Sequence, residues 1–188
     1  NTFIELNGMG NLTHMGSYET CLTSNGYRNS STQWTSYAVN SITGASQIRL
    51  NPNGYIAFGT ESNKANGSSH VVTERLRISS VGRVLIGTTT EGHGNADDLT
   101  VATAGGSLGH TGITIRSGTS SDGNIFFSDA TSGGGETIGG IKYKHGGAGS
   151  NPETLNFIAN GLTRATVGAT YLYVDDGTNG RITLQPES

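Results

Sequence analysis

Carboxylates are the side chains of this sequence that come nearest to catalytic chemistry. Two of them held about 5–9.5 Å apart would equip a protein to hydrolyse a polysaccharide. The candidates are Glu61, Glu74, Asp122, Asp129, Glu136, Asp175 and Asp176. Their spacing forces no two of them together, and Asp122 and Asp176 each precede a glycine, where turn chemistry already explains an Asp. We therefore expect no catalytic residue and no enzyme, with a polysaccharide hydrolase as the alternative.

The histidines and the single cysteine do not have the spacing of metal ligands. His14, His70, His93, His110 and His145 occur singly, and Cys21 is the only cysteine. His110 and His145, each next to a glycine, would bind an ion only where copies of the chain met at a symmetry axis. Exposed loop positions are the simpler interpretation. We expect no metal site and no cofactor.

Two aromatic residues are the candidate ligand contacts. Trp34, the only tryptophan, and Tyr37 lie in a Thr- and Ser-rich segment, and aromatic rings with a polar group suit the faces of sugars. The competing interpretation, which we favour, is that Trp34 packs in a core that is short of large apolar residues. Trp34 and Tyr37 remain the predicted glycan contact if the segment has one.

The composition predicts a thin β protein that shares its core between copies. Gly, Ser, Thr and Asn account for 91 of the 188 residues, whereas Leu, Ile, Val and Phe account for 38. One copy has little apolar surface with which to offset about 1–2 kcal/mol of backbone entropy per residue. The net charge of −3 and eleven scattered Lys and Arg residues argue against a nucleic-acid partner. No apolar stretch approaches the roughly 20 residues that would span a bilayer, so we expect no membrane insertion.

A hairpin pattern recurs at an offset of 28 residues. Residues 48–60 align with residues 76–88, and each copy reads apolar-x-apolar, a turn ending in Gly, then alternating apolar residues and Gly-Thr. Residues two apart share a face of a strand, and glycine allows the positive φ of a hairpin turn. We expect Tyr55 and Arg83 to lie on one side of the hairpins. The opposite side is expected to be a common buried side that holds Ile48, Leu50, Ile56, Phe58, Leu76, Ile78, Val84 and Ile86.

Looser copies extend the pattern towards the C-terminus. We expect hairpins from 113–115 to 125–127, from 155–157 to 163–165 and from 171–173 to 182–184. Stacked short hairpins favour an elongated, prism-like all-β architecture, and an ordinary β-sandwich is the alternative. The predicted divisions are a small aromatic-bearing β unit at 1–40, a repeated hairpin segment at 41–97 and a second β segment with Gly-rich loops at 98–188.

The repeated element resembles a segment of bacteriophage tail fibres. The run Glu74-Arg-Leu-Arg-Ile-Ser-Ser-Val-Gly-Arg-Val-Leu-Ile-Gly-Thr88 is similar to one in fibre proteins of marine and cyanobacterial phages. Supporting similarities lie at 26–36, 44–54 and 123–129. The resemblance implies an intertwined homotrimeric fibre segment, upstream of a C-terminal intramolecular chaperone that this sequence does not contain.

These observations give a functional expectation. The chain is expected to be a structural and adhesive module of a virion tail fibre, extracellular when it functions, that contributes to attachment to the host cell surface. Its expected partners are two identical copies, other phage tail proteins, and a host surface glycan or outer-membrane protein. The alternatives are a segment of a polysaccharide-degrading tailspike, a head fibre and a trimeric surface adhesin.

Overall fold

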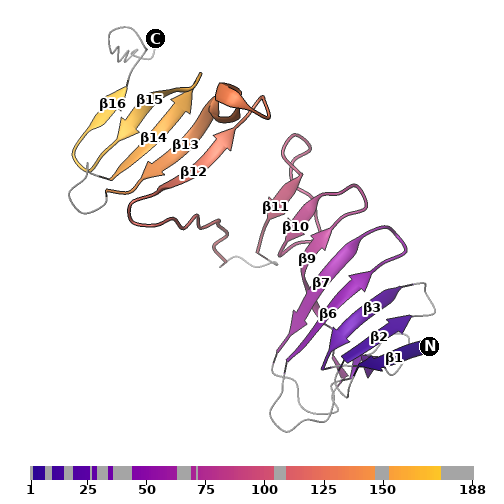
Figure 1. Ribbon diagram of the computed structural model, residues 1–188. Coiled ribbons are helices and arrows are strands. Elements are labelled where there is room, and N and C mark those ends of the chain that lie inside the picture. The colour runs from indigo at the N-terminus through magenta and orange to yellow at the C-terminus, as the bar shows by residue number, and fades with distance from the viewer. Residues whose placement is uncertain are drawn as a thin grey trace, which may run out of the picture. The chain divides into compact units, whose positions relative to one another are not determined.

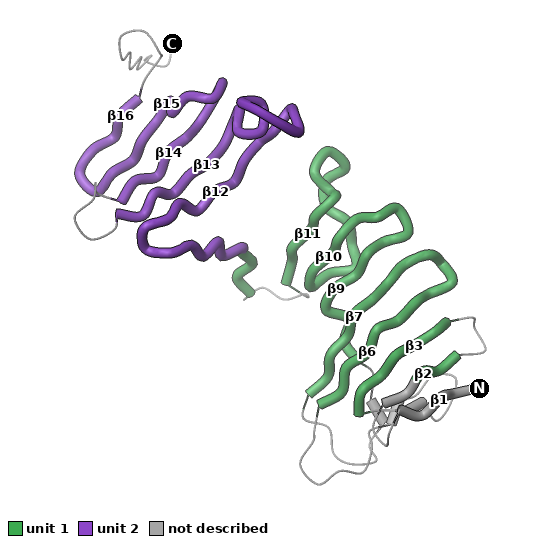
Figure 2. Tube along the Cα trace, in the orientation of Figure 1, with its two compact units in different colours: residues 1–112 green, residues 113–188 purple. Residues whose placement is uncertain are grey.

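The computed structural model is all-β, and its chain divides into two compact units, residues 1–112 and 113–188 (Figure 2). The structure describes residues 2–6, 10–14, 19–25, 27–28, 34–35, 44–62, 69–70, 72–103, 109–146 and 153–174. The all-β fold predicted from sequence alternation is therefore confirmed. The boundary between the units lies after residue 112, and the expected division at 97/98 falls within the first unit.

The first unit is built on one eight-stranded sheet (Figure 1). Every neighbouring pair is antiparallel except the last, β10 and β11. In spatial order the strands are β1 (Thr2–Leu6), β2 (Gly10–His14), β3 (Thr20–Ser24), β6 (Ala45–Leu50), β7 (Ile56–Glu61), β9 (Thr73–Ile78), β10 (Val84–Ile86) and β11 (Leu99–Val101). Strands β1 to β3 belong to this same sheet, so much of the expected 1–40 unit is continuous with the repeated hairpins.

The two matched hairpins are confirmed, and their turns have the same geometry. In β6–β7 the amide of Asn51 donates to the carbonyl of Tyr55, and Gly54 donates to Asn51. In β9–β10 Ser79 donates to Arg83, and Gly82 donates to Ser79. Gly54 and Gly82 have φ values of 84° and 88°, which side-chain-bearing residues seldom adopt. The glycines therefore set the turn and, through it, the register of each hairpin.

The parallel pair β10–β11 requires a crossover, which residues 87–98 supply without a helix. The crossover begins at Gly87, whose φ is 73° and where a Cβ would lie 2.0 Å from the carbonyl oxygen of Ala102. It is held over the sheet by Arg83, whose guanidinium pairs with Asp97 at 2.8 Å and with Glu91. Leu85 lies on the same face as Arg83 and is 1% exposed.

A small three-stranded sheet in this unit carries the tryptophan. It contains β4 (Tyr27–Arg28), β5 (Trp34–Thr35) and β8 (Ser69–His70), in that order. Trp34 pairs through its backbone with Arg28 on one side and His70 on the other.

The second unit is a five-stranded antiparallel meander, preceded by an irregular segment (Figure 1). Its strands are β12 (Asp122–Phe127), β13 (Gly139–Lys144), β14 (Thr154–Ala159), β15 (Leu162–Val167) and β16 (Leu172–Val174). The short 3-10 helix η1 (Gly133–Thr137) connects β12 to β13. A two-residue turn joins β14 to β15, where Asn160 and Gly161 have φ values of 55° and 71°.

Of the three looser hairpins that the sequence predicts, one is confirmed, one is wrong and one is only partly described. The β14–β15 hairpin is the expected pairing of residues 155–157 with 163–165. The expected hairpin from 113–115 to 125–127 is wrong, because residues 113–115 form no strand and β12 pairs instead with β13. Tyr171-Leu-Tyr173 overlaps β16, which pairs with β15, and its expected partner at 182–184 lies outside the described residues.

Candidate assembly interface

One face of the first sheet carries nearly all of the large apolar side chains that the structure describes in it. The register places them in two rows that run across the strands. The central row contains Leu12, Leu22, Ile48, Phe58, Leu76, Ile86 and Val101. The turn-side row, next to the two matched turns, contains Leu50, Ile56, Ile78, Val84 and Leu99. We call this surface the first open face.

Within one chain the first open face is not covered. Leu50 is 49% exposed, Leu99 is 53% exposed and Phe58 is 38% exposed. Among the described residues, the buried hydrophobic side chains are instead Cys21, Ala57, Val72 and Leu85. All eight residues predicted to share a side do so, and Tyr55 and Arg83 lie opposite. The expectation that this side is buried does not hold in the single chain.

A hollow borders the central row on the side away from the matched turns. Here the third row consists of the small polar residues Ser24, Ser46 and Thr60. Because these side chains are shorter than those of the central row, they leave a mostly apolar hollow of about 430 Å³. Its lining is Leu22, Thr23, Ser24, Ser46, Gln47, Ile48, Phe58, Gly59 and Thr60.

The opposite face of the first sheet is closed by an ion-pair network. Glu74 accepts hydrogen bonds from the guanidinium groups of Arg49 at 2.9 Å and Arg77 at 2.8 Å. Arg49 also lies 3.2 Å from Glu19, and the ring of Tyr55 lies beneath Arg77 at 4.0 Å. The hydrogen bond that Arg77 donates to Glu74 raises the pKa of Arg77, although desolvation opposes the shift. Ala57 pairs with both arginines, and their long side chains cover it, which explains its burial at 2% exposure.

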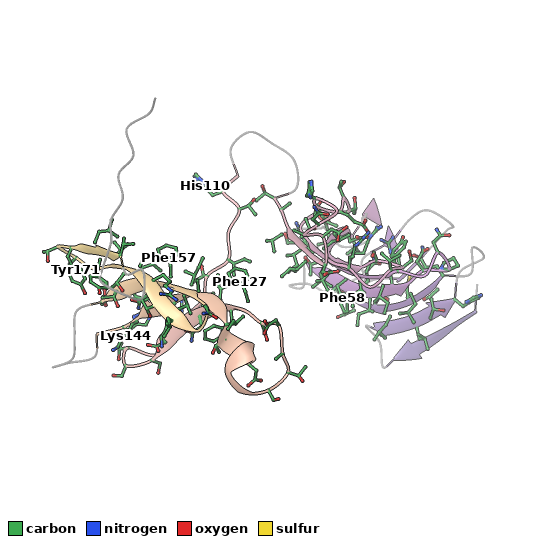
Figure 3. All side chains as sticks on the ribbon, turned by 90° about the horizontal axis from the view of Figure 1, so that it is seen from above. Phe58, His110, Phe127, Lys144, Phe157 and Tyr171 are labelled. Atoms are coloured by element: carbon green, nitrogen blue, oxygen red, sulfur yellow. The ribbon has the colours of Figure 1, made fainter. Side chains whose placement is uncertain are left out.

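The second sheet repeats the division into two faces. Phe127 is 60% exposed, and Phe157 is 41% exposed. Both residues are labelled in Figure 3. They share a face, the second open face, which contains Ile125, Phe127, Ile141, Tyr143, Leu155, Phe157, Leu162, Val167 and Leu172. Both units therefore present a largely uncovered apolar side, and Ile115 of the irregular segment lies against one edge of the second open face.

The polar face of the second sheet is held mainly by hydroxyl and amide groups. Thr166 donates to the side-chain oxygen of Asn156 at 2.8 Å, and Asn156 donates to Thr154 at 3.2 Å. Lys142 pairs with Asp122 at 2.6 Å, while among the described residues Lys144 forms no ion pair. A depression of about 500 Å³ on this face is lined by Lys142, Lys144, Thr154, Asn156, Thr163, Thr166 and Tyr171. Lys144 and Tyr171 are labelled in Figure 3.

Tyr143 links the second open face to the segment before β14. Its hydroxyl donates to Glu153 at 2.7 Å, and this hydrogen bond is the main reason why the pKa of Tyr143 is raised. The ring of His145 meets the ring of Tyr143 edge-on, with centroids 4.8 Å apart. His145, one of the two glycine-flanked histidines, therefore lies on the second open face. His110, the other, is exposed.

The structure assigns several of the candidate carboxylates to local roles. Glu74 belongs to the arginine network, Asp122 pairs with Lys142, and Glu61 accepts a hydrogen bond from Thr73. The backbone amide of Asp129 donates to the carbonyl of Gly135, and Glu136 lies on η1. Asp175 and Asp176 lie outside the described residues.

The predicted glycan contact is only partly described. Trp34 is placed by its backbone on β5, and Tyr37 lies outside the described residues, so the pairing of Trp34 with Tyr37 stays a prediction. The depression beside Lys144 was missed by the sequence reasoning. The sequence feature that could have indicated it is the alternation Lys142-Tyr-Lys144, which places two cations on one face of a strand.

Metal sites and membrane spans are two further kinds of feature on which the described residues bear. In the part of the chain that the structure describes, no three His, Cys, Asp or Glu side chains gather as a metal would require. Nor do the described residues form a helix with the length and apolar character of a membrane span. Comparison of the chain with protein-family models, with curated proteins and with solved structures finds no match.

Proposed function

We propose that the chain is a structural and adhesive module of a phage tail fibre, and that it assembles as a homotrimer that helps the virion attach to its host. The observation that carries the proposal is the pair of open apolar faces. Monomers seldom expose apolar patches larger than a few hundred Å². Eight strands spaced by about 4.8 Å and about 17 Å long make a face of roughly 650 Å², and five such strands add roughly 400 Å². Together these exceed the roughly 800 Å² per partner of a stable interface.

The length of the strands favours three copies. A six-residue strand is about 20 Å long, and three sheets of that width close a triangular prism whose walls lie about 6 Å from its axis. Packed sheets lie about 10 Å apart, which places each about 5 Å from their midplane. Three walls can therefore be filled by the side chains of the open faces. Four walls of this width would lie about 10 Å from the axis, which leaves a channel that these side chains do not fill.

The tail-fibre part of the proposal rests on the resemblance at Glu74–Thr88. In the structure this run contains the second matched hairpin, and its apolar residues Leu76, Ile78, Val84 and Ile86 all contribute to the first open face. The residues that carry the resemblance are thus the ones that an assembled fibre would bury. Other tail proteins are the proposed partners within the virion.

The adhesive part of the proposal concerns the polar faces, which a prism leaves on its outside. The depression beside Lys144 offers a cation, amide and hydroxyl groups and the ring edge of Tyr171, which suit an acidic host glycan. Three copies on one trimer would raise apparent affinity by about 10²–10⁴ through avidity. Trp34 and Tyr37 are the second candidate contact.

Incubation of the purified protein with host capsule and lipopolysaccharide tests this function. We expect binding without release of reducing ends, weakened in Lys144→Gln and unchanged in Lys64→Gln, a matched charge removal elsewhere in the sequence. Release of reducing ends that one carboxylate substitution abolishes would instead establish a tailspike. Neither binding nor cleavage would overturn the adhesive part and leave a segment of the fibre shaft.

A further inference from the structure

We propose that, in the trimer, Leu50 of each copy inserts into the hollow beside Ser46 of the next copy, which fixes the axial register of the assembly. This inference rests on the trimer proposed above. It goes beyond the number of copies, because it states which residues meet across the interface.

The side chains along the two margins of the open side of the first sheet differ in size. One margin is the turn-side row, and the other is the polar third row beyond the central row. The turn-side margin consists of large apolar residues, and its residue on β6 is Leu50, which is 49% exposed. The other margin consists of Ser24, Ser46 and Thr60. The hollow that these short side chains leave has apolar walls, formed by Leu22, Ile48 and Phe58. One margin therefore projects and the other recedes.

This asymmetry suits a three-fold axis. At each corner of a triangular prism, one margin of a sheet meets the opposite margin of the next sheet at an internal angle of about 60°. So narrow a corner has room for large side chains from one margin only, because protein interiors pack without overlap. The contact is head-to-tail, and it closes into a ring after three copies.

Rotation about the axis also determines which strands meet. The strands run across the prism and stack along its axis, and rotation leaves the height of every strand unchanged. Strand β6 of one copy therefore meets β6 of the next, which brings Leu50 to Ser46. On the next strand the same reasoning brings Ile56 to Thr60.

A second copy of the chain is the occupant that the hollow fits. The hollow offers mostly carbon atoms to a partner and lies in the same open face that supplies the projecting leucine, so one surface carries both halves of the contact. Leu50 does not reach the hollow of its own chain, because four residues along a strand separate it from Ser46 by about 13 Å.

Cysteine cross-linking tests the pairing. The double variant Ser46→Cys/Leu50→Cys is expected to give a covalent trimer under oxidising conditions, which denaturing electrophoresis detects and a reductant reverses. The variants with Ser46→Cys alone and Leu50→Cys alone control for Cys21, which is 0% exposed. Ile56→Cys/Thr60→Cys is the second pair and tests the same register should the first variant fail to fold.

The matched control uses the same margins at different heights. Ser46→Cys/Leu99→Cys places one cysteine on β6 and the other on β11, four strands away in the sheet order and therefore separated by about 19 Å. Disulfides require Cα atoms within about 7 Å, so this variant is expected to stay uncrosslinked.

The outcomes separate the inference from the trimer itself. Suppose that light scattering finds a trimer. If neither matched pair then cross-links, or if the control cross-links equally well, the Leu50–Ser46 contact is overturned and the trimer is retained. A protein that light scattering finds dimeric, and that cross-links no further than a covalent dimer, overturns the three-fold arrangement. A folded monomer overturns both.

Discussion

The two large sheets of this protein have similar open faces and different polar faces. In the first sheet, arginine and glutamate side chains form a network around Ala57, and the crossover covers Leu85. In the second sheet, Thr and Asn side chains bond to one another around a solvent-filled depression. Most of the large apolar side chains lie on the open face in both units, although Phe126 and Ile158 lie on the opposite face of the second sheet. Polar side chains thus pair with one another on one face of each sheet, and the other face is the one that the proposed trimer would bury.

The difference between the polar faces suggests different roles. The network of the first sheet matches its charges within the chain, since Glu74 lies between two arginines and Asp97 faces Arg83. The second sheet leaves Lys144 and several hydroxyl groups facing solvent. Under the proposed function, we therefore expect the first unit to extend the fibre and the second to contact the host.

The similarity of the open faces gives the prediction with the largest expected effect. Phe58→Asp and Phe157→Asp are each expected to abolish assembly, because three carboxylates would be placed in a dry interface at a cost of several kcal/mol per ion. Asn53→Asp and Thr163→Asp add the same charge at exposed positions outside the open faces and should assemble normally. Light scattering measures the mass of each variant. Assembly of Phe157→Asp but not of Phe58→Asp would limit the interface to the first unit.

The ion-pair network gives the next largest effect. Glu74→Gln leaves Arg49 and Arg77 without their shared carboxylate and is expected to lower the free energy of unfolding by about 1.5–3 kcal/mol. Glu91→Gln removes a more exposed partner, with 37% of its side chain accessible, and should cost about 0–1 kcal/mol. Denaturant unfolding compares the two. Equal effects would contradict a special role for the network.

The matched turns provide a pair of glycines with the same φ and different surroundings. Gly82→Ala is expected to cost about 1–2 kcal/mol, the usual strain of a side chain in the left-handed region. Gly54→Ala should cost more, because its Cβ would also lie 3.2 Å from the Cβ of Ser80, whereas nothing lies within 4 Å of the corresponding point at Gly82. Thermal unfolding of both variants measures the difference. A more damaging Gly82→Ala would contradict the equivalence of the turns.

The smallest expected effect concerns Tyr143 in the second sheet. Its raised pKa means that the folded state holds the phenol proton more tightly than the unfolded chain does. The resulting stability is fully present below the unfolded pKa of about 10 and is lost as pH rises through the higher folded value. Tyr143→Phe should therefore flatten the alkaline part of the stability profile. An unchanged profile would show that the hydrogen bond to Glu153 does not contribute.

The sequence predicted those parts of the fold that depend on local pattern. The matched hairpins follow from alternation and from Gly54 and Gly82, which together set face and register. The β14–β15 hairpin follows from Asn160-Gly161 in the same way. Residues 113–115 also alternate, yet pattern alone does not choose a partner, and β12 pairs with β13, which lies farther away in the sequence than residues 113–115.

Non-local pairing explains what the sequence did not predict. The parallel contact of β10 with β11 depends on a twelve-residue crossover, residues 87–98, that has no repeat to mark it. The arginine network depends on register across three strands, which places Arg49 and Arg77 on either side of Ala57. The depression beside Lys144 likewise requires strands β13, β14 and β15 to be aligned before its lining residues come together.

Multi-angle light scattering of the purified protein at micromolar concentration tests the central claim most directly. Each chain has a mass of 19.4 kDa, so the account predicts a single species of about 58 kDa that does not dissociate on dilution. The open faces would then be buried between copies. A folded 19.4 kDa monomer that is stable at that concentration would contradict the account.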